Sequence, residues 1–158
     1  MDRFPLTRVG YEKLRGELAQ LKTVERAKNI KDIEEARAHG DLSENAEYSA
    51  AKEKQGLINS RILELDNIFS RAEIIEHDSI RDKSRIVFGA TVRLHDEAAE
   101  HEITYQIVGD YESDIKENKI AISSPIAKGL IGKSAGDEVS ITTPKGVRVL
   151  EILNISYI

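Results

Sequence analysis

The chain contains no cysteine among its 158 residues, which excludes disulfides, thiolate metal sites and cysteine nucleophiles. Tryptophan is also absent and only three phenylalanines occur, so no large aromatic platform is available for stacking nucleic acid bases. An excess of basic residues is missing as well. The formal net charge is −5, whereas a protein that binds phosphates over its whole surface is usually basic. This charge still leaves room for a local basic patch.

Long apolar runs are missing too. No stretch approaches the ~20 apolar residues that a membrane-spanning helix requires. The opening sequence MDRFPLTRVG lacks the apolar segment of a signal peptide. We therefore expect no membrane association and a cytoplasmic location, and the length suits one ordinary domain or two small ones.

The first half of the chain has the periodicity of two long helices. From about 8 to 39 an apolar stripe repeats at helical spacing, with an irregularity at 24–27, and we place on it Leu14, Leu18, Leu21, Ile30 and Ile33. From about 43 to 72 steps of four and three form a heptad seam of Ala51, Gln55, Ile58, Ile62, Leu65 and Phe69. Thr7 is the expected N-cap of the first helix and Gly40 its stop.

Two long helices joined by a very short turn must lie antiparallel, so residues 1–76 are predicted to form a coiled-coil hairpin with its tip at 40–45. Residues 77–84 read as a polar linker. Residues 85–158 contain short Ile- and Val-rich runs separated by turn residues, which is typical of strands. Within them Ser124 and Pro125 mark the start of one short helix. The pattern predicts an α+β protein whose small antiparallel sheet wraps that helix.

The tip combines Asp41 and Glu44 in one short turn. One interpretation is a capping box, in which Asp41 caps the second helix and Glu44 lies three residues on. The other is an exposed pair of carboxylates that binds a hard cation such as Mg²⁺ weakly, with open positions for ligands from a partner. The local sequence leaves both open.

Arg37 and Lys52 lie close to the tip, one on each predicted helix. They fit an ordinary solvated surface with ion pairs along the helix. They also fit a small basic patch that meets RNA or phosphate just behind the acidic turn. Two other motifs do not indicate a binding site. GLIGKS (129–134) is no phosphate-binding loop, because Ala127 stands where that motif needs glycine. His95 and His101 lack the spacing of a zinc-binding motif.

Three segments resemble the signatures of one family. They are EARAHGDLSENAEYSAAKEKQG (35–56), VFGATV (87–92) and SSPIAKGLIGKSAGDEV (123–139). They resemble the bacterial transcript-cleavage factors of the GreA/GreB family, and the similarity covers essentially the whole chain. Few basic residues lie near the tip, which resembles the GreA branch more than the GreB branch. The resemblance implies an antiparallel two-helix coiled coil followed by an FKBP-like β domain.

The resemblance also implies a function. Such a factor inserts its coiled coil into the secondary channel of bacterial RNA polymerase and stimulates the polymerase's own Mg²⁺-dependent cleavage of the nascent RNA 3′ end. By similarity, Asp41 and Glu44 help to hold the second Mg²⁺ there. The chain would then be no enzyme by itself, would have no cofactor of its own, and would share Mg²⁺ with the polymerase.

Other residues carry expected contacts by the same similarity. Arg37 and Lys52 match a basic patch that contacts the RNA, with Lys52 where arginine is also expected; lysine lacks the bidentate fork of arginine. Ser124, Pro125 and Lys133 match the polymerase-docking region. We expect a monomer.

Two alternatives remain. One is a coiled-coil polymerase-binding inhibitor without cleavage stimulation, although a tip that keeps both acids favours the cleavage-stimulating class. The other is a prolyl isomerase, on the strength of the FKBP-like half. Such an enzyme needs an aromatic-lined pocket, and the only aromatic residues after residue 77 are Phe88, Tyr105, Tyr111 and Tyr157.

Overall fold

The computed structural model describes residues 3–40 and 45–158. The chain forms two units, one of Tyr11–Arg71 and one of Met1–Gly10 together with Ala72–Ile158. The sequence placed all of residues 1–76 in the hairpin, whereas the structure groups the first ten residues and those after Arg71 with the C-terminal unit. The two units are described in turn.

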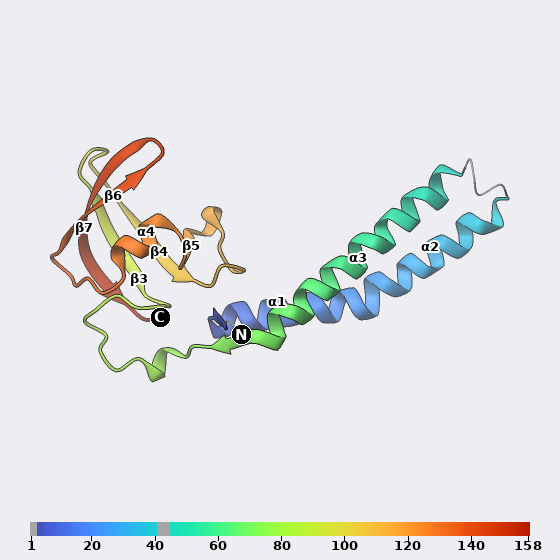
Figure 1. Cartoon of the computed structure of the whole chain (residues 1–158), viewed down its shortest axis with the longest axis horizontal. Helices are drawn as coiled ribbons and strands as arrows, with labels where there is room; N and C mark the ends of the chain where they lie inside the picture. The colour runs from blue at the N-terminus through green and yellow to red at the C-terminus, as the bar shows by residue number, and fades with distance from the viewer. Residues whose placement is uncertain (1–2, 41–44) are drawn as a thin grey trace. The chain divides into compact units, whose positions relative to one another are not determined.

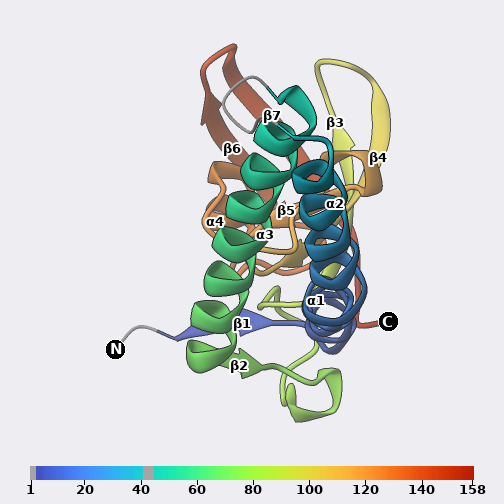
Figure 2. The same cartoon turned by 90° about the vertical axis from the view of Figure 1, so that its right-hand side faces the viewer.

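The helical unit is a hairpin. Its first arm consists of α1 (Arg8–Gln20), a π-helical turn (Leu21–Glu25) and α2 (Arg26–Ala38), and its second arm is α3 (Ala46–Arg71). In Figures 1 and 2 α2 and α3 lie side by side, and they contact each other along their length. The predicted pair of long helices is confirmed. No helix within 3–40 or 45–158 is both long enough and apolar enough to cross a membrane.

The seam between the arms is made of aliphatic side chains. Its buried apolar members are Leu14, Ile33, Ala36, Ala51, Ile58, Ile62, Leu65 and Ile68. At the base Ile68 is buried in place of the expected Phe69, whose half-buried ring meets the edge of Tyr11 at 5.5 Å. Arg61 on α3 also holds Glu17 on α1 through two hydrogen bonds of 2.7 and 2.9 Å.

The π-helical turn changes which residues face α3. There the N–H of Arg26 bonds to the carbonyl of Leu21, five residues back, so the turn holds one extra residue and rotates everything that follows. As a result Asn29 is buried at 2% exposure, whereas Ile30 is 47% exposed. The expectation that Ile30 continues the apolar stripe was therefore wrong. Thr23 assists the irregular turn, since its hydroxyl donates to the carbonyl of Ala19 at 2.7 Å.

The C-terminal unit contains a five-stranded sheet. Its strands are β3 (Thr91–Asp96), β4 (His101–Val108), β5 (Lys119–Ala121), β6 (Glu138–Thr143) and β7 (Gly146–Ser156), in the order β5-β4-β3-β7-β6 (Figure 1). All neighbours run antiparallel except β4 and β5, which run parallel. The sheet is thus mixed, whereas the sequence predicted a wholly antiparallel one. A separate ribbon pairs β1 (Phe4–Leu6) with β2 (Ala72–Ile74) in parallel.

One short helix, α4 (Pro125–Leu130), packs against β5 and β6. Ser124 is its N-cap, with Oγ accepting the N–H of Ala127 at 3.2 Å, as predicted. The core between helix and sheet is aliphatic and includes Val92, Leu94, Ile107, Ala127, Leu130, Val139, Ile141, Leu150 and Ile152. The α+β class, a helical hairpin followed by a β-rich domain with one short α-helix, is confirmed.

The segment before β3 was predicted as strand and is instead a buried loop. Ile86 donates its N–H to the carbonyl of Lys133 at 2.9 Å and accepts from the N–H of Gly132 at 2.8 Å. Phe88 and Ala90 are buried beside it. Apolar residues thus filled the core here without pairing along a strand, and alternation of apolar residues alone does not distinguish the two cases.

The N-terminus of α1 is held by two side chains. Thr7 Oγ1 accepts the N–H of Gly10 at 3.0 Å, which confirms Thr7 as the N-cap. Glu112, after β4, accepts the N–H of Thr7 at 3.0 Å, the hydroxyl of Thr7, and the N–H of Gly109 at 2.8 Å. The first turn of α1 has no acid of its own, so Glu112 provides the negative charge that a helix N-terminus favours.

Candidate functional site

The distal end of the hairpin is built from two helix termini. On the first arm α2 ends at Ala38, His39 is its C-cap, and Gly40 follows with φ of +107°. That left-handed conformation favours glycine and ends the helix, as the sequence predicted. Asp41 and Glu44, the predicted metal-binding acids, lie outside the described residues.

Asn45 connects the two arms at this end. Its Oδ1 accepts the N–H of Tyr48 at 3.1 Å, which makes Asn45 the N-cap of α3. Its Nδ2 donates to the main-chain oxygen of Ala36 on α2 at 2.7 Å. Asn45 is therefore the N-cap of α3, and the capping-box interpretation concerns Asp41 and Glu44, which lie outside the described residues. The position of Asn45 directly before an alanine-rich helix was the available signal, since asparagine is among the strongest N-cap residues.

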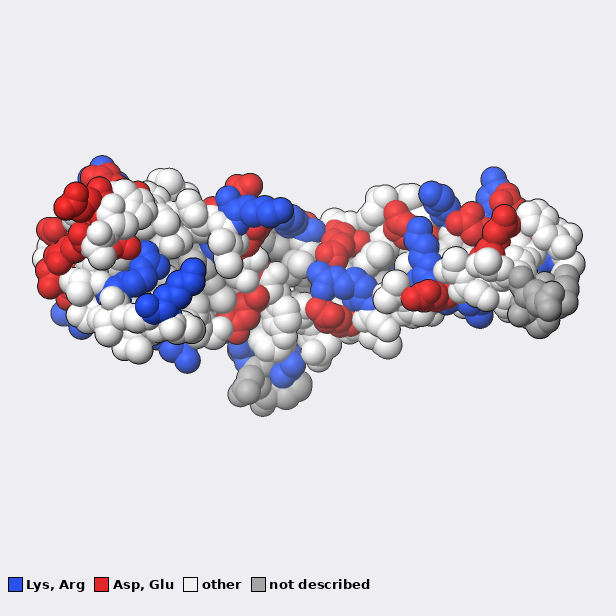
Figure 3. Space-filling model, turned by 90° about the horizontal axis from the view of Figure 1, so that it is seen from above, with Lys and Arg blue, Asp and Glu red and all other residues white. Residues whose placement is uncertain are grey.

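A second contact spans the arms beside Asn45. His39 Nδ1 lies 3.0 Å from Glu47 Oε2, and both side chains are mostly exposed. They line an open groove of about 370 Å³, together with Asp32, Glu35, Ala50, Ala51 and Lys54. In Figure 3 basic and acidic side chains alternate along the visible face of the hairpin. In 3–40 and 45–158 no group of three or more histidine, aspartate or glutamate side chains is arranged to bind a metal ion.

The two predicted basic residues share one face of the hairpin. The guanidinium of Arg37 lies 6.0 Å from the centre of the Tyr48 ring, which is cation–π range. Lys52 is one turn further along α3 from Tyr48 and therefore on the same side of that helix. Its Nζ donates to Gln55 Oε1 at 2.7 Å. Both cations are exposed, so Arg37 and Lys52 lie on the same side of the hairpin as Tyr48 with their charges open to solvent.

The three predicted docking residues separate into two places. Ser124 and Pro125 line an open groove of about 410 Å³ whose other walls are Tyr105, Ser113, Ile115, Lys119, Ile120, Ala121, Ile126, Thr143 and Pro144. Most of these surfaces are apolar, and Ile115 is 87% exposed. Lys133 is not part of this lining. Its main chain bonds to Ile86 and Leu130 while its side chain is exposed.

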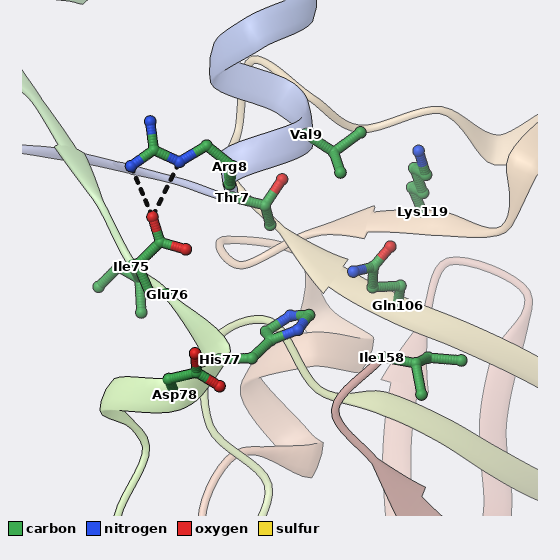
Figure 4. A pocket seen from close by; sticks show the side chains of 10 residues that line it. All are labelled: Thr7, Arg8, Val9, Ile75, Glu76, His77, Asp78, Gln106, Lys119 and Ile158. Atoms are coloured by element: carbon green, nitrogen blue, oxygen red, sulfur yellow. Dashed lines mark hydrogen bonds and ion pairs between the residues drawn. The ribbon is translucent and has the colours of Figure 1, made fainter.

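Another cavity, of about 420 Å³, lies beside β1 and β2 (Figure 4). Its charged groups neutralise one another in part: Arg8 binds Glu76 through contacts of 2.6 and 2.8 Å, drawn as dashed lines. His77 faces the cavity and meets the Tyr157 ring at 6.1 Å between centroids. No local sequence pattern indicates this cavity, because its walls come from segments far apart in the chain.

Two carboxylate arrangements set the electrostatics of the sheet. Asp96 accepts the N–H groups of Ala98 and Ala99 and binds Arg148 at 3.0 Å. These contacts lower the pKa of Asp96, and the hydrogen bond from the N–H of Ala99 contributes most. Glu97 lies against Glu138, and the hydrogen bond and repulsion between the two carboxyls raise the pKa of Glu97.

Two family models match the chain, one for each half. Residues 4–74 match "Transcription elongation factor, N-terminal", and residues 81–157 match "Transcription elongation factor, GreA/GreB, C-term". Together the two matches cover most of the chain, one over the helical hairpin and the other over the β-rich domain. The chain belongs to the GreA/GreB family of transcription elongation factors.

Two relatives similar along nearly their whole sequence support the same assignment. Transcription elongation factor GreA of Rickettsia felis is 55% identical over 155 residues, covering 98% of this chain and 95% of the relative. GreA of Nitrosococcus oceani is 50% identical over 157 residues, or 99% of each chain. Among solved structures, the GreA factor homolog 1 (Gfh1) of Thermus thermophilus is 32% identical over 98% of this chain and 99% of that one, with a TM-score of 0.44.

Proposed function

We propose that this protein reactivates backtracked bacterial RNA polymerase. In this proposal the hairpin enters the secondary channel of the polymerase, and Asp41 and Glu44 contribute ligands to a second Mg²⁺ at the polymerase active site. The polymerase then cleaves its own RNA near the 3′ end. Membership of the GreA/GreB family along both halves of the chain supports this function.

The chemistry explains why a separate protein would deliver carboxylates. Two metal ions ~3.5–4 Å apart stabilise both the attacking and the leaving oxygen of a phosphodiester cleavage. Magnesium prefers oxygen ligands and is commonly held by one or two carboxylates together with phosphate oxygens. An elongated hairpin that carries two acids at its turn can bring such ligands to a site that its other domain never reaches.

The observation that carries the proposal is the dual role of Asn45. This residue caps α3 and binds the last turn of α2 through Ala36. Asn45 thus accepts one N–H at the start of α3 and donates to one carbonyl near the end of α2, and Gly40 donates its N–H to the carbonyl of Arg37. The chain between Gly40 and Asn45 contains Asp41 and Glu44, and neither acid is needed as the N-cap of α3. Their carboxylates can then serve an ion supplied elsewhere.

The surroundings of the turn suit the same function. Arg37 and Lys52 lie on the same side of the hairpin as Tyr48, and exposed cations there would bind the phosphates of extruded RNA. On the C-terminal unit, the apolar groove beside Ser124 and Pro125 offers a surface for docking on the polymerase. The role of Lys133 would be a separate charge contact.

The test is transcript cleavage by a halted polymerase. Purified bacterial polymerase is stalled in a backtracked state, supplied with Mg²⁺ and this protein, and the release of short RNA 3′ fragments is followed. Asp41→Asn and Glu44→Gln remove one charge each while keeping the side-chain shape. Glu53→Gln removes an exposed charge from α3, away from the turn, and is the matched control.

We expect fragments with the native protein and with Glu53→Gln, and little or no stimulation with either tip variant, although both still bind the polymerase. Equal stimulation by all four proteins would overturn the assignment of the acids. Binding without stimulation by the native protein would favour an inhibitor instead. A reaction mixture with RNA and no polymerase should yield no fragments, and turnover of a prolyl peptide in that mixture would favour an isomerase.

A further inference from the structure

One polar side chain is buried in the seam of the hairpin. Three buried polar residues occur in 3–40 and 45–158, namely Thr7, Asn29 and Asp96, and only Asn29 belongs to the helical unit. It is 2% exposed and belongs to the same stripe of α2 as Ile33 and Ala36, which are also buried. An amide in such surroundings is costly unless it is hydrogen-bonded, so its presence requires a specific partner.

That partner is on the other arm. Asn29 Nδ2 donates to the main-chain oxygen of Ala51 on α3 at 2.9 Å. The approach depends on the small side chain of Ala51, which leaves the carbonyl of its helix within reach. Further along the α3 seam the next residues are Gln55, Ile58 and Ile62, whose larger side chains would cover the main chain. Asn29 therefore fits opposite one position of α3.

Apolar layers alone do not fix how two helices are aligned along their axes. Sliding one arm by one layer, or three to four residues, moves it by about 5 Å and places aliphatic side chains against other aliphatic side chains again. The same slide places Asn29 opposite a bulky residue and leaves its amide without the carbonyl of Ala51. A single buried asparagine is a well-attested way of selecting one alignment in coiled coils, at some cost in stability.

We propose that Asn29 is a positioning residue that sets the axial alignment of α2 against α3, and thereby the position of the turn between Gly40 and Asn45. This inference rests on the proposed function in one respect, since the turn carries the acids that act at the polymerase. The π-helical turn is part of the device, because its extra residue brings Asn29 rather than Ile30 into the seam. The Asn45–Ala36 bond fastens the same two arms near the tip.

The alignment can be measured without any partner. The chain has no cysteine, so two introduced cysteines take spin labels selectively. Lys13→Cys on α1 and Ser49→Cys on α3 are exposed positions near opposite ends of the hairpin, and a slide changes their separation almost one for one. Pulsed electron–electron resonance then compares the native seam with Asn29→Leu, which fills the site without an amide, and with Asn29→Ala, which adds no bulk. The control is Asn59→Leu, at an exposed position of α3.

We expect one narrow distance for the native seam and for Asn59→Leu. Asn29→Leu and Asn29→Ala should broaden the distribution or add a second distance displaced by about 5 Å, while Asn29→Leu melts at the same temperature or higher. An unchanged narrow distance in both Asn29 variants would overturn the proposal. Loss of helical circular dichroism in both would overturn it as well, because the amide would then maintain folding rather than select an alignment.

Cleavage by halted polymerase provides the functional readout. Asn29→Leu should bind polymerase as tightly as the native protein and stimulate cleavage several-fold less, because only part of the population presents the turn correctly. If the native protein stimulates no cleavage, the proposed function fails while the distance measurement still decides the alignment. If the alignment shifts and cleavage remains at the native level, the positioning role of Asn29 in cleavage is refuted, although its role in aligning α2 with α3 is confirmed.

Discussion

The side-chain amide of Asn45 donates a 2.7 Å hydrogen bond to the main-chain oxygen of Ala36. That carbonyl, in the last turn of α2, also accepts the N–H of His39, and Asn45 caps α3 with its own Oδ1. Helix ends leave several backbone groups without intrahelical partners, and a single side chain here serves one end of each arm. Asn45 thus connects the two arms at the distal end of the hairpin.

Replacing Asn45 with alanine should destabilise the helical unit by about 1–3 kcal/mol, because an N-cap contributes ~0.5–2 kcal/mol and the second hydrogen bond about 1 kcal/mol. The measurement is chemical unfolding followed by far-ultraviolet circular dichroism. Asn59→Ala is the control: Asn59 is exposed within α3, and alanine there is neutral or slightly stabilising. Equal stability of the two variants would contradict the dual role of Asn45.

Glycine at position 10 has a specific structural reason, in contrast to glycine at position 16 in the same helix. A Cβ at Gly10 would lie 1.7 Å from Glu112 Oε1, whereas a Cβ at Gly16 meets nothing within 4 Å. Glu112 is held by bonds from Thr7 and Gly109, so it cannot move aside without losing them.

Gly16→Ala should therefore raise the free energy of unfolding by roughly 0.5–1 kcal/mol, as alanine usually does in a helix interior. Gly10→Ala should lower it by about 1–3 kcal/mol, since the displaced carboxylate leaves main-chain donors unpaired. Combining Gly10→Ala with Glu112→Ala relieves the overlap, and this double variant should be no less stable than Glu112→Ala alone. Stabilisation by Gly10→Ala would show that Glu112 is dispensable for the start of α1.

The pair Glu97 and Glu138 should make the C-terminal unit more stable when one charge is removed. Contact between the two carboxyls raises the pKa of Glu97. A raised pKa in the folded state contributes stability below the pKa of the unfolded chain and loses it as the pH rises through the folded value. At pH 7 the side chains of Glu97 and Glu138 repel each other, so Glu138→Gln should increase the melting temperature there.

The increase should shrink as the pH falls through the raised pKa of Glu97, because protonation of the Glu97 carboxyl in the native protein removes the repulsion. Glu102→Gln is the control, because Glu102 lies 3.9 Å from Arg93 and has a cation as its neighbour. That variant should be neutral or slightly destabilising at pH 7. A stabilisation by Glu138→Gln that is independent of pH would point to packing rather than charge.

Local signals accounted for much of the fold. Thr7, Gly40 and Ser124 were predicted as helix boundaries because each residue type satisfies a backbone requirement within three or four residues. Most of the α3 seam followed from its heptad spacing, which depends only on helical geometry. Such features are encoded over short distances, so no knowledge of the rest of the chain is needed.

Features that depend on distant segments were predicted poorly. The sequence revealed an irregularity near 24–27, but not that a π-helical turn would rotate Asn29 into the seam and Ile30 out of it. The parallel pairing of β4 with β5 has no local signature, because a three-residue strand does not encode its direction. The role of Asn45 was missed since its second partner, Ala36, belongs to the other arm.

The basic side of the hairpin tests the RNA contact directly. Arg37 and Lys52 lie on the same side as Tyr48, and lysine offers a point charge where arginine would offer a two-pronged donor. In the polymerase cleavage assay, Arg37→Ala and Lys52→Ala should each reduce stimulation about tenfold, as the loss of a charged hydrogen bond of roughly 1.5 kcal/mol implies. Lys52→Arg should raise stimulation above the native level.

These changes should depend on salt, because each phosphate contact removed lowers the steepness with which binding weakens as salt rises. Lys31→Ala is the control, an exposed cation on α2 that lies away from Tyr48 and should leave cleavage at the native level. A general effect of net charge would make Lys31→Ala as harmful as Lys52→Ala. If Lys52 contacts the RNA locally, Lys52→Ala should reduce cleavage and Lys31→Ala should not. Only a local contact also explains a gain of activity in Lys52→Arg, which leaves the net charge unchanged.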